Sequence, residues 1–276
     1  MTLPLKSALS TLTVAAAIVC ASFVQAREGV AALSEALLLP EVVDLLKEEG
    51  LRYGESLDED VLTGTGGPYF AGQVARIYDT GNMLETLENM LAQGMDREDL
   101  SKSTAFFASE SGQRILRLEV SARRAMGDPA VDEIAELAWR AAETDGDARF
   151  NAILDFIAVN DLDDRNVAGA LSSNYQFFRG LVKGGSHKMS DDEMLSEVWS
   201  QEENIRAETA TWLKSFLFMA YSPLSDDEMD AYLAYSDSDA GQALNAALFD
   251  GFDEMYRTIY FALGLAVAEA LQASEL

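Results

Sequence analysis

Apolar residues recur every three or four positions along nearly the whole chain, which is the spacing of one face of an α-helix. No segment alternates β-branched and polar residues as a half-buried strand does. Glycines and prolines such as Pro40, Pro68 and Gly127 interrupt the pattern. We therefore predict an all-α protein, folded as a helical array or bundle. The predicted helices span residues 41–49, 68–93, 96–107, 109–126, 130–144, 148–160, 164–182, 190–221, 225–236 and 239–272.

Residues 1–26 have the layout of a secretory signal peptide. Lys6 precedes an apolar stretch over 8–24, and Val24 and Ala26 stand at positions −3 and −1 of a cleavage site. Serines and threonines within the stretch fit cleavage better than a membrane anchor. A lipoprotein would need a small residue before Cys20, where the chain has Val19. We expect export to the periplasm of a Gram-negative bacterium.

The composition excludes several classes of function. The chain has 47 acidic and 20 basic residues and a net charge of −27, which repels nucleic acid. Its one cysteine falls in the predicted signal peptide, so thiol nucleophiles and cysteine metal sites are excluded. His187, the one histidine, lies in a glycine-rich stretch that we interpret as a surface linker. The apolar run between Arg257 and Glu269 is too short to span a bilayer, so we do not expect an integral membrane protein.

Two segments that lie 129 residues apart, 95–120 and 224–249, share a motif. Both begin with acidic residues at a helix start, and an aromatic residue and a second helix start follow. Identical residues occupy the paired positions Ala105 and Ala234, Ser109 and Ser238, Gly112 and Gly241, and Gln113 and Gln242. We therefore predict two diverged tandem repeats, 27–145 and 146–276, which form either separate units or one continuous core.

Each residue of the motif has a predicted structural role. Ser225 and Glu228 have the spacing of a capping box, and Ser109 and Ser238 can cap the helices that follow them. A glycine in the first turn allows close contact with the preceding helix, and a glutamine can bond to loop carbonyls. We interpret this set as structural: Ser109, Gly112, Gln113, Ser225, Glu228, Ser238, Gly241 and Gln242.

The pattern of an acidic helix start, an aromatic residue and Ser-x-x-Gly-Gln resembles the bacterial domain-of-unknown-function family 2059. The members of that family are mostly secreted helical proteins of Gram-negative bacteria. The resemblance covers the motif in both halves but not residues 129–183. The family usually has a proline in the capping turn, where this chain has Glu110-Ser111 and Asp239-Ala240. The resemblance implies a helical fold and export, and it brings no catalytic residues.

No constellation satisfies the requirements of catalysis or of metal binding. A calcium loop that starts at Asp237 would need glycine at its sixth position and a carboxylate at its twelfth, where Gln242 and Leu248 stand. Glu110 would need an apolar pocket to act as a general acid, and the predicted first turn is exposed. We predict no catalytic residue, no metal and no cofactor.

Arg114, Arg117 and Arg124 fall close to one stripe of a predicted helix. In so acidic a chain this stripe could receive an acidic partner or an anionic ligand. The interpretation that we favour is pairing with acidic helices of the same molecule.

Three hypotheses for the function follow. The first is a non-enzymatic periplasmic interaction module that binds another envelope protein through helical faces. The second is a carrier that holds an apolar or lipid-like ligand between the repeats. The third is a carboxylate-dependent cell-wall hydrolase, which requires a buried pair of acids in one cleft.

Overall fold

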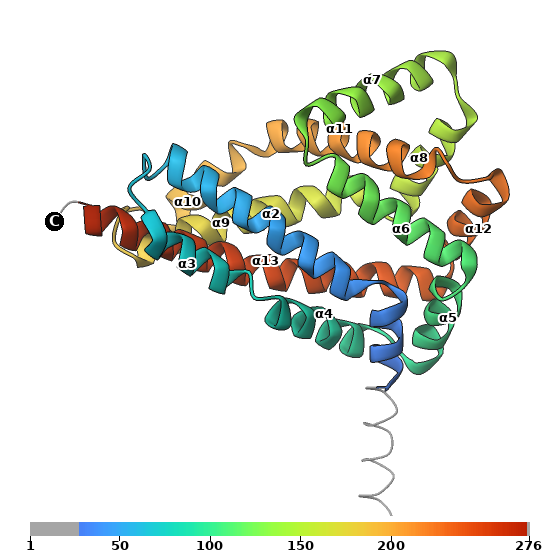
Figure 1. Ribbon diagram of the computed structural model, residues 1–276, viewed down its shortest axis with the longest axis horizontal. Helices are drawn as coiled ribbons and strands as arrows, with labels where there is room; N and C mark the ends of the chain where they lie inside the picture. Colours follow the sequence, from blue (N-terminus) through green and yellow to red (C-terminus); the bar gives the residue numbers. More distant parts are fainter. Residues whose placement is uncertain (1–27, 275–276) are drawn as a thin grey trace, which may run out of the picture.

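The computed structural model describes residues 28–274 and contains only helices and their connections over that range (Figure 1). The predicted all-α class is therefore confirmed for this part of the chain. The predicted signal peptide lies outside the described residues. Residues 28–36 are helical, and the elements that follow are α2 (Leu39–Asp60), α3 (Gly67–Ile77), α4 (Thr80–Gly94), α5 (Arg97–Phe107), α6 (Glu110–Ala125), α7 (Pro129–Asp145), α8 (Ala148–Val159), α9 (Leu162–Lys183), α10 (Asp191–Trp199), α11 (Glu202–Tyr221), α12 (Asp226–Ser236) and α13 (Asp239–Ser274).

Helix α13 is the central element, and the first-half helices α3, α4 and α5 pack on it together with α9 (Figure 1). It has 36 residues, and Ile259, Leu263 and Val267 on it are buried. Glycines bring α9 and α13 into backbone contact. A Cβ added to Gly264 would lie 2.1 Å from the carbonyl oxygen of Phe177, and one added to Gly180 would lie 2.3 Å from that of Phe261. The prediction that the C-terminal segment is a buried core helix is confirmed.

Membrane crossing requires a long helix that is also apolar over about 20 residues. None of the helices in residues 28–274 meets both requirements.

Three predicted helix boundaries were wrong. Helix α2 continues through Gly50, which is buried because its bare Cα lies against the ring of Tyr78. The predicted helix 68–93 is two helices, since the carboxylate of Asp79 accepts the N–H of Asn82 at 2.9 Å and starts α4. The predicted helix 190–221 is likewise divided into α10 and α11 at residues 200–201.

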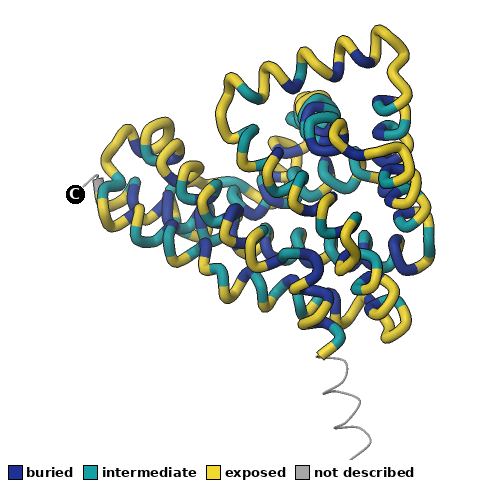
Figure 2. The backbone as a smooth tube through the Cα atoms, turned by 45° about the vertical axis from the view of Figure 1, so that its right-hand side comes forward, coloured by how far each residue is buried: buried dark blue, intermediate teal, exposed yellow. Residues whose placement is uncertain are grey.

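Buried apolar residues from both predicted repeats belong to one hydrophobic cluster. It contains Leu33, Leu87 and Ile115 from the first repeat, and Leu217 and Leu263 from the second. Figure 2 shows these buried positions gathered where the helices meet, whereas α7 is exposed along most of its length. A second, small cluster joins α7 to α8 through Trp139 and Phe150, whose rings stack at 5.9 Å.

Candidate ligand-binding cavity

The serines of the shared motif cap their helices in the same way. Ser109 Oγ accepts the N–H of Gly112 at 3.1 Å and donates to the carbonyl of Phe106 at 2.6 Å. Ser238 Oγ accepts the N–H of Gly241 at 3.1 Å and donates to the carbonyl of Tyr235 at 2.6 Å. These contacts satisfy backbone groups that a helix start leaves free, so both serines cap the helices that follow them.

The glycines and glutamines of the motif also have matching contacts. A Cβ on Gly112 would lie 2.3 Å from the oxygen of Phe106, and one on Gly241 would lie 2.1 Å from that of Tyr235. Gln113 Nε2 donates to the carbonyls of Ala36 and Phe107 at 2.7 and 2.9 Å. Gln242 Nε2 donates to those of Val159 and Ser236 at 3.0 and 2.7 Å. Each glutamine therefore bridges two chain segments.

The predicted capping box is present at Ser225 and Glu228. The carboxylate of Glu228 accepts the N–H of Ser225 at 2.8 Å, and Ser225 Oγ accepts the N–H of Glu228. The hydrogen bonds from Ser225 lower the pKa of Glu228. Ser190 and Glu193 form a second box at the start of α10, with the same Ser-x-x-Glu signal in the sequence.

The three arginines of the predicted stripe differ in their contacts. Arg114 donates two hydrogen bonds to the carboxylate of Glu228, at 2.8 and 2.9 Å, and a third to the carbonyl of Pro223. Within residues 28–274, Arg117 donates a hydrogen bond to Gln113, four residues before it, and Arg124 is exposed and makes no ion pair. Intramolecular pairing therefore accounts for Arg114 and does not account for Arg117 or Arg124.

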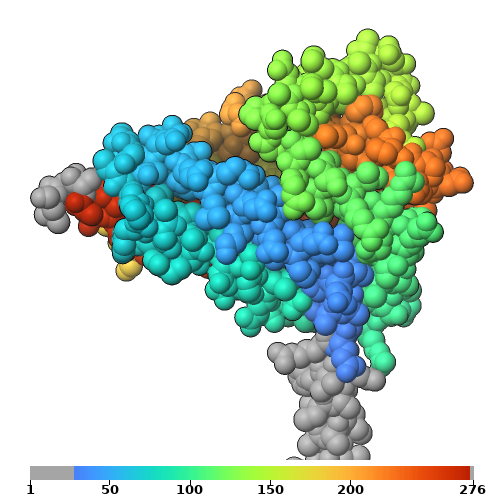
Figure 3. All heavy atoms as spheres, in the orientation of Figure 1, coloured from blue at the N-terminus to red at the C-terminus, as the bar shows by residue number. Residues whose placement is uncertain are grey.

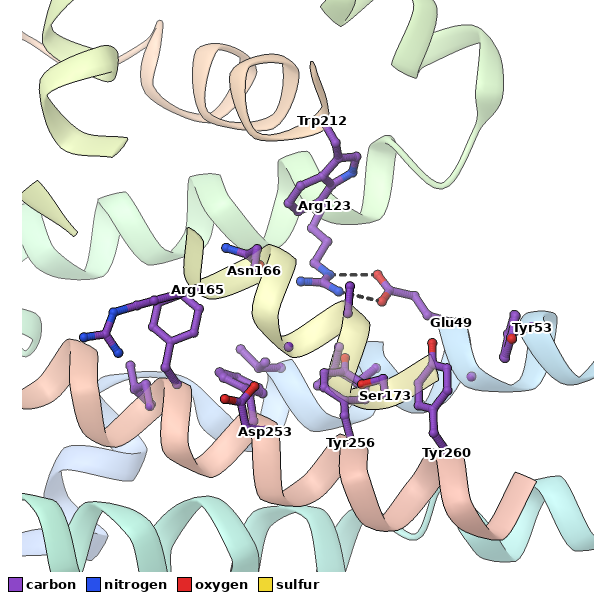
Figure 4. Close-up of a pocket in the computed structure, with 18 of the residues that line it drawn as sticks. Glu49, Tyr53, Arg123, Arg165, Asn166, Ser173, Trp212, Asp253, Tyr256 and Tyr260 are labelled. Carbon is purple, nitrogen blue, oxygen red and sulfur yellow. Dashed lines mark hydrogen bonds and ion pairs between the residues drawn. The ribbon is translucent and has the colours of Figure 1, made fainter. Parts of the chain in front are cut away.

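Arg123, beside the stripe, points into the molecule. Its Nε and one terminal nitrogen donate to the two carboxylate oxygens of Glu49 on α2, each at 2.9 Å. Its guanidinium lies 5.8 Å from the ring centroid of Trp212 on α11. This bidentate ion pair joins α2 to α6 and forms part of the wall of a cavity (Figure 4).

The cavity has a volume of about 670 Å³ and lies between α2, α9 and α13. That size is typical of sites for small organic molecules. A smaller recess of about 260 Å³ shares Glu49, Arg123 and Trp212 with it. In Figure 3 the surface is hollowed between α2 and the helices α6 and α7. Seven aromatic side chains line the main cavity: Tyr53, Tyr78, Trp212, Phe249, Phe252, Tyr256 and Tyr260.

Side-chain size explains why this space is empty. Helix α9 contributes the small residues Gly169, Ala170 and Ser173 to the wall. Helix α13 contributes one face, with lining residues from Asn245 to Tyr260. Fifteen residue steps at about 1.5 Å each make this face about 22 Å long. The cavity is therefore elongated along α13.

One end of the cavity is rich in phenols. The ring centroids of Tyr53 and Tyr260 are 5.9 Å apart, and those of Tyr256 and Tyr260 are 6.2 Å apart. Burial raises the pKa of all three hydroxyls above the ordinary tyrosine value. They are therefore neutral hydrogen-bonding groups at any pH near 7.

The other end carries two charges of opposite sign. Arg165 extends over the ring of Phe249 at 5.3 Å, and its Nε is buried and has no hydrogen-bond partner within residues 28–274. The nearest ion-pair contact is Asp161 Oδ2 at 3.8 Å. Asp253 accepts no hydrogen bond within residues 28–274. Partial burial, and secondarily Asp250, raise the pKa of Asp253.

A carboxyl group with a raised pKa also lies outside the cavity. Glu119 on α6 accepts hydrogen bonds from the hydroxyls of Tyr221 at 2.8 Å and Tyr232 at 3.2 Å. Burial raises the pKa of Glu119 to about 7, although the two hydroxyls oppose the shift. The sequence carries no local signal for this site, because its three members come from distant segments.

The described residues contain no group of three or more metal-ligating side chains. His187 is exposed, and its Nδ1 lies 3.1 Å from Ser186 Oγ. Comparison of the chain with protein-family models, curated proteins and solved structures finds no match. The resemblance to family 2059 therefore stays a prediction.

Proposed function

We propose that this is a non-enzymatic periplasmic binding protein whose two halves, diverged copies of one helical unit, hold an apolar or lipid-like molecule between them. The observation that carries the proposal is the aromatic-walled cavity of about 670 Å³ along α13. A soluble protein rarely leaves so much apolar surface unfilled without a ligand to cover it.

Matching elements support the duplication. Helices α5 and α12 span 97–107 and 226–236, and α6 and α13 begin at 110 and 239, so the shift of 129 residues holds for both pairs. Helices α2 and α9 each have 22 residues. A residue with left-handed backbone precedes each of them, Leu38 at φ 56° and Asp161 at φ 52°.

Reciprocal contacts between the halves support it as well. The rings of Phe106 and Tyr235, which are equivalent under the shift of 129, stack at 4.2 Å. Phe106 also stacks on Tyr232, and Tyr235 donates to Ser103, the equivalent of Tyr232, at 2.8 Å. Such self-matching contacts are the pattern of a two-fold dimer interface.

The two halves also contribute paired positions to the cavity wall, under a shift of 123 residues instead of 129, and these positions differ in chemistry. A shift of 123 residues, the one that separates Leu38 from Asp161, pairs Leu46 with Gly169 and Val42 with Arg165, and all four line the cavity. At one of these paired positions, the first half presents the apolar Val42 to the cavity and the second half presents the charged Arg165. A cavity whose walls differ in chemistry between the two halves suits a ligand with two unlike ends.

The test is ligand binding with a filled-cavity variant. Wild-type residues 27–276 should bind the neutral fluorescent probe N-phenyl-1-naphthylamine with saturation. Ala170→Phe, which places a ring in the cavity, should weaken that binding at least about tenfold, whereas Ala168→Phe on the exposed side of α9 should not. Native mass spectrometry of protein from the producing cell's envelope should find a small added mass that organic solvent removes. Equal binding by both variants would contradict the proposal.

A second candidate, the interaction module, is favoured by the outer face of α7. Ile134 is 66% exposed and Leu137 is 62% exposed, one helical turn apart. We expect Ile134→Ser with Leu137→Ser to leave the thermal midpoint unchanged and to remove any stoichiometric protein adduct seen in native mass spectrometry. Retention of such an adduct by the double variant would rule out this face as its contact.

A further inference from the structure

Arg165 carries one of two buried side-chain polar atoms that lack a hydrogen-bond partner within residues 28–274. The other, Gln73 Oε1, is not part of the cavity wall. Buried donors are almost always satisfied in native proteins, so an orphaned Nε–H in a cavity wall calls for an acceptor from outside the chain.

The neighbouring acids do not hydrogen-bond to it, although the charge of Arg165 is close enough to that of Asp253 to oppose the rise in the pKa of that carboxyl. Asp161 approaches only to 3.8 Å, which is beyond hydrogen-bond distance. Glu49, on the other side of the cavity, uses both of its carboxylate oxygens for Arg123. The ring of Phe249 supports one face of the Arg165 guanidinium and leaves its edge available. In Figure 4, Arg165 and the Glu49–Arg123 pair lie at separate places on the wall.

We propose that Arg165 binds the anionic oxygen head group, a carboxylate or a phosphate, of an elongated amphipathic molecule whose apolar body lies along α13 toward Tyr260. This inference rests on the proposed function of the cavity. A guanidinium offers planar paired donors that match these oxyanions. The wall of α13 beyond Phe249 offers Phe252, Tyr256 and Tyr260 over the following turns.

The matched position in the other half sets the direction of the ligand. Val42, 123 residues before Arg165, lines the same cavity and can receive only apolar groups. Asp253 also borders the cavity and repels an anion, so the head group must lie on the arginine side of it. An anionic amphiphile therefore fits in one orientation.

The experiment compares two fluorescent probes in wild type and in Arg165→Met. The anionic probe is cis-parinarate, a long-chain carboxylate, and the neutral probe is N-phenyl-1-naphthylamine. The variant should bind cis-parinarate about tenfold to a hundredfold more weakly, the loss expected for one charge-assisted contact. Its affinity for the neutral probe should change less than about twofold. Arg165→Lys should recover part of the loss, and Arg124→Met, an exposed arginine outside the cavity, should bind both probes as wild type does.

The outcomes separate the two proposals. If wild type binds neither probe, the proposed function fails. If both probes bind and Arg165→Met weakens neither, the cavity is a ligand site but the head-group assignment is overturned. Competition by palmitate or by lysophosphatidate, lost in Arg165→Met, supports the assignment and identifies the head group as carboxylate or phosphate. Competition by either that survives in Arg165→Met contradicts it.

Discussion

Two pairs of segments, one from each predicted repeat, differ in how alike their paired residues are. Around the α5 and α12 contact, equivalent residues do equivalent work: Ser109 and Ser238 cap, and Gly112 and Gly241 allow the same close approach. Along α2 and α9, equivalent positions have unlike chemistry, as Val42 and Arg165 do. A backbone turn admits few residues, whereas a cavity wall tolerates many. If the halves are copies of one unit that holds a ligand, as we propose, the cavity wall is the place where their chemistry differs.

The largest expected effect comes from substitutions at Gly112 and Gly241, which disrupt the matching first turns of α6 and α13. Gly241→Val places a side chain 2.1 Å from the carbonyl oxygen of Tyr235, where backbone must move, and Gly112→Val meets the same obstacle at 2.3 Å. Each should lower the free energy of unfolding by about 3 kcal/mol or more. Urea unfolding followed by circular dichroism measures it. Gly72→Val, whose nearest neighbour is an arginine tip at 3.8 Å, is the control and should cost less than about 1 kcal/mol. Equal losses in all three would refute the steric explanation.

A pH experiment tests the contact of Glu119 with Tyr221 and Tyr232, which joins the two predicted repeats. Since burial raises the pKa of Glu119 to about 7, the folded protein binds this proton more tightly than the unfolded chain. The stability due to Glu119 is fully present below pH 4.5 and is lost as the pH rises to about 7, by on the order of 2 kcal/mol. The Glu119→Gln variant should lack that part of the pH dependence in urea titrations between pH 4.5 and 8. Glu110→Gln, at an exposed position, should retain it; an unchanged profile in Glu119→Gln would contradict the prediction.

Smaller effects are expected at the two caps. Ser109→Ala and Ser238→Ala should each lower the free energy of unfolding by about 1 kcal/mol, because each leaves the N–H of a first-turn glycine without its acceptor. Thermal unfolding measures both, with Ser101→Ala on the exposed face of α5 as the control. Losses that differ by more than about 1 kcal/mol would show that the two turns are alike in geometry and not in energy.

The smallest expected effect tests the head-group site at Arg165, in the region where paired residues differ in chemistry. Asp253→Asn removes the negative charge beside the proposed head-group site and should raise the affinity for cis-parinarate about threefold. The measurement is a fluorescence titration at pH 7.5, with Asp44→Asn on the exposed side of α2 as the control. A weaker affinity in Asp253→Asn would mean that this carboxylate holds the ligand.

Local signals predicted much of the fold because each depends on a few neighbouring residues. Ser225 and Glu228 identify a helix start by spacing alone, and the apolar period identifies α13 as a buried helix. The failures have the same origin. Glycine often ends a helix, but here the ring of Tyr78 covers Gly50 and α2 continues through it. The division between α3 and α4 depends on the single cap at Asp79.

The sequence by itself determined the all-helical class, the capping turns and the shared motif, since backbone hydrogen bonds and helix periodicity are properties of short segments. Only the tertiary structure decided the cavity. Glu49 and Arg123 are 74 residues apart, and the wall of Arg165, Trp212 and Tyr256 comes from three helices. The sequence of one segment does not show which polar residues of other segments its own polar residues will contact. That choice follows from how the helices pack around α13.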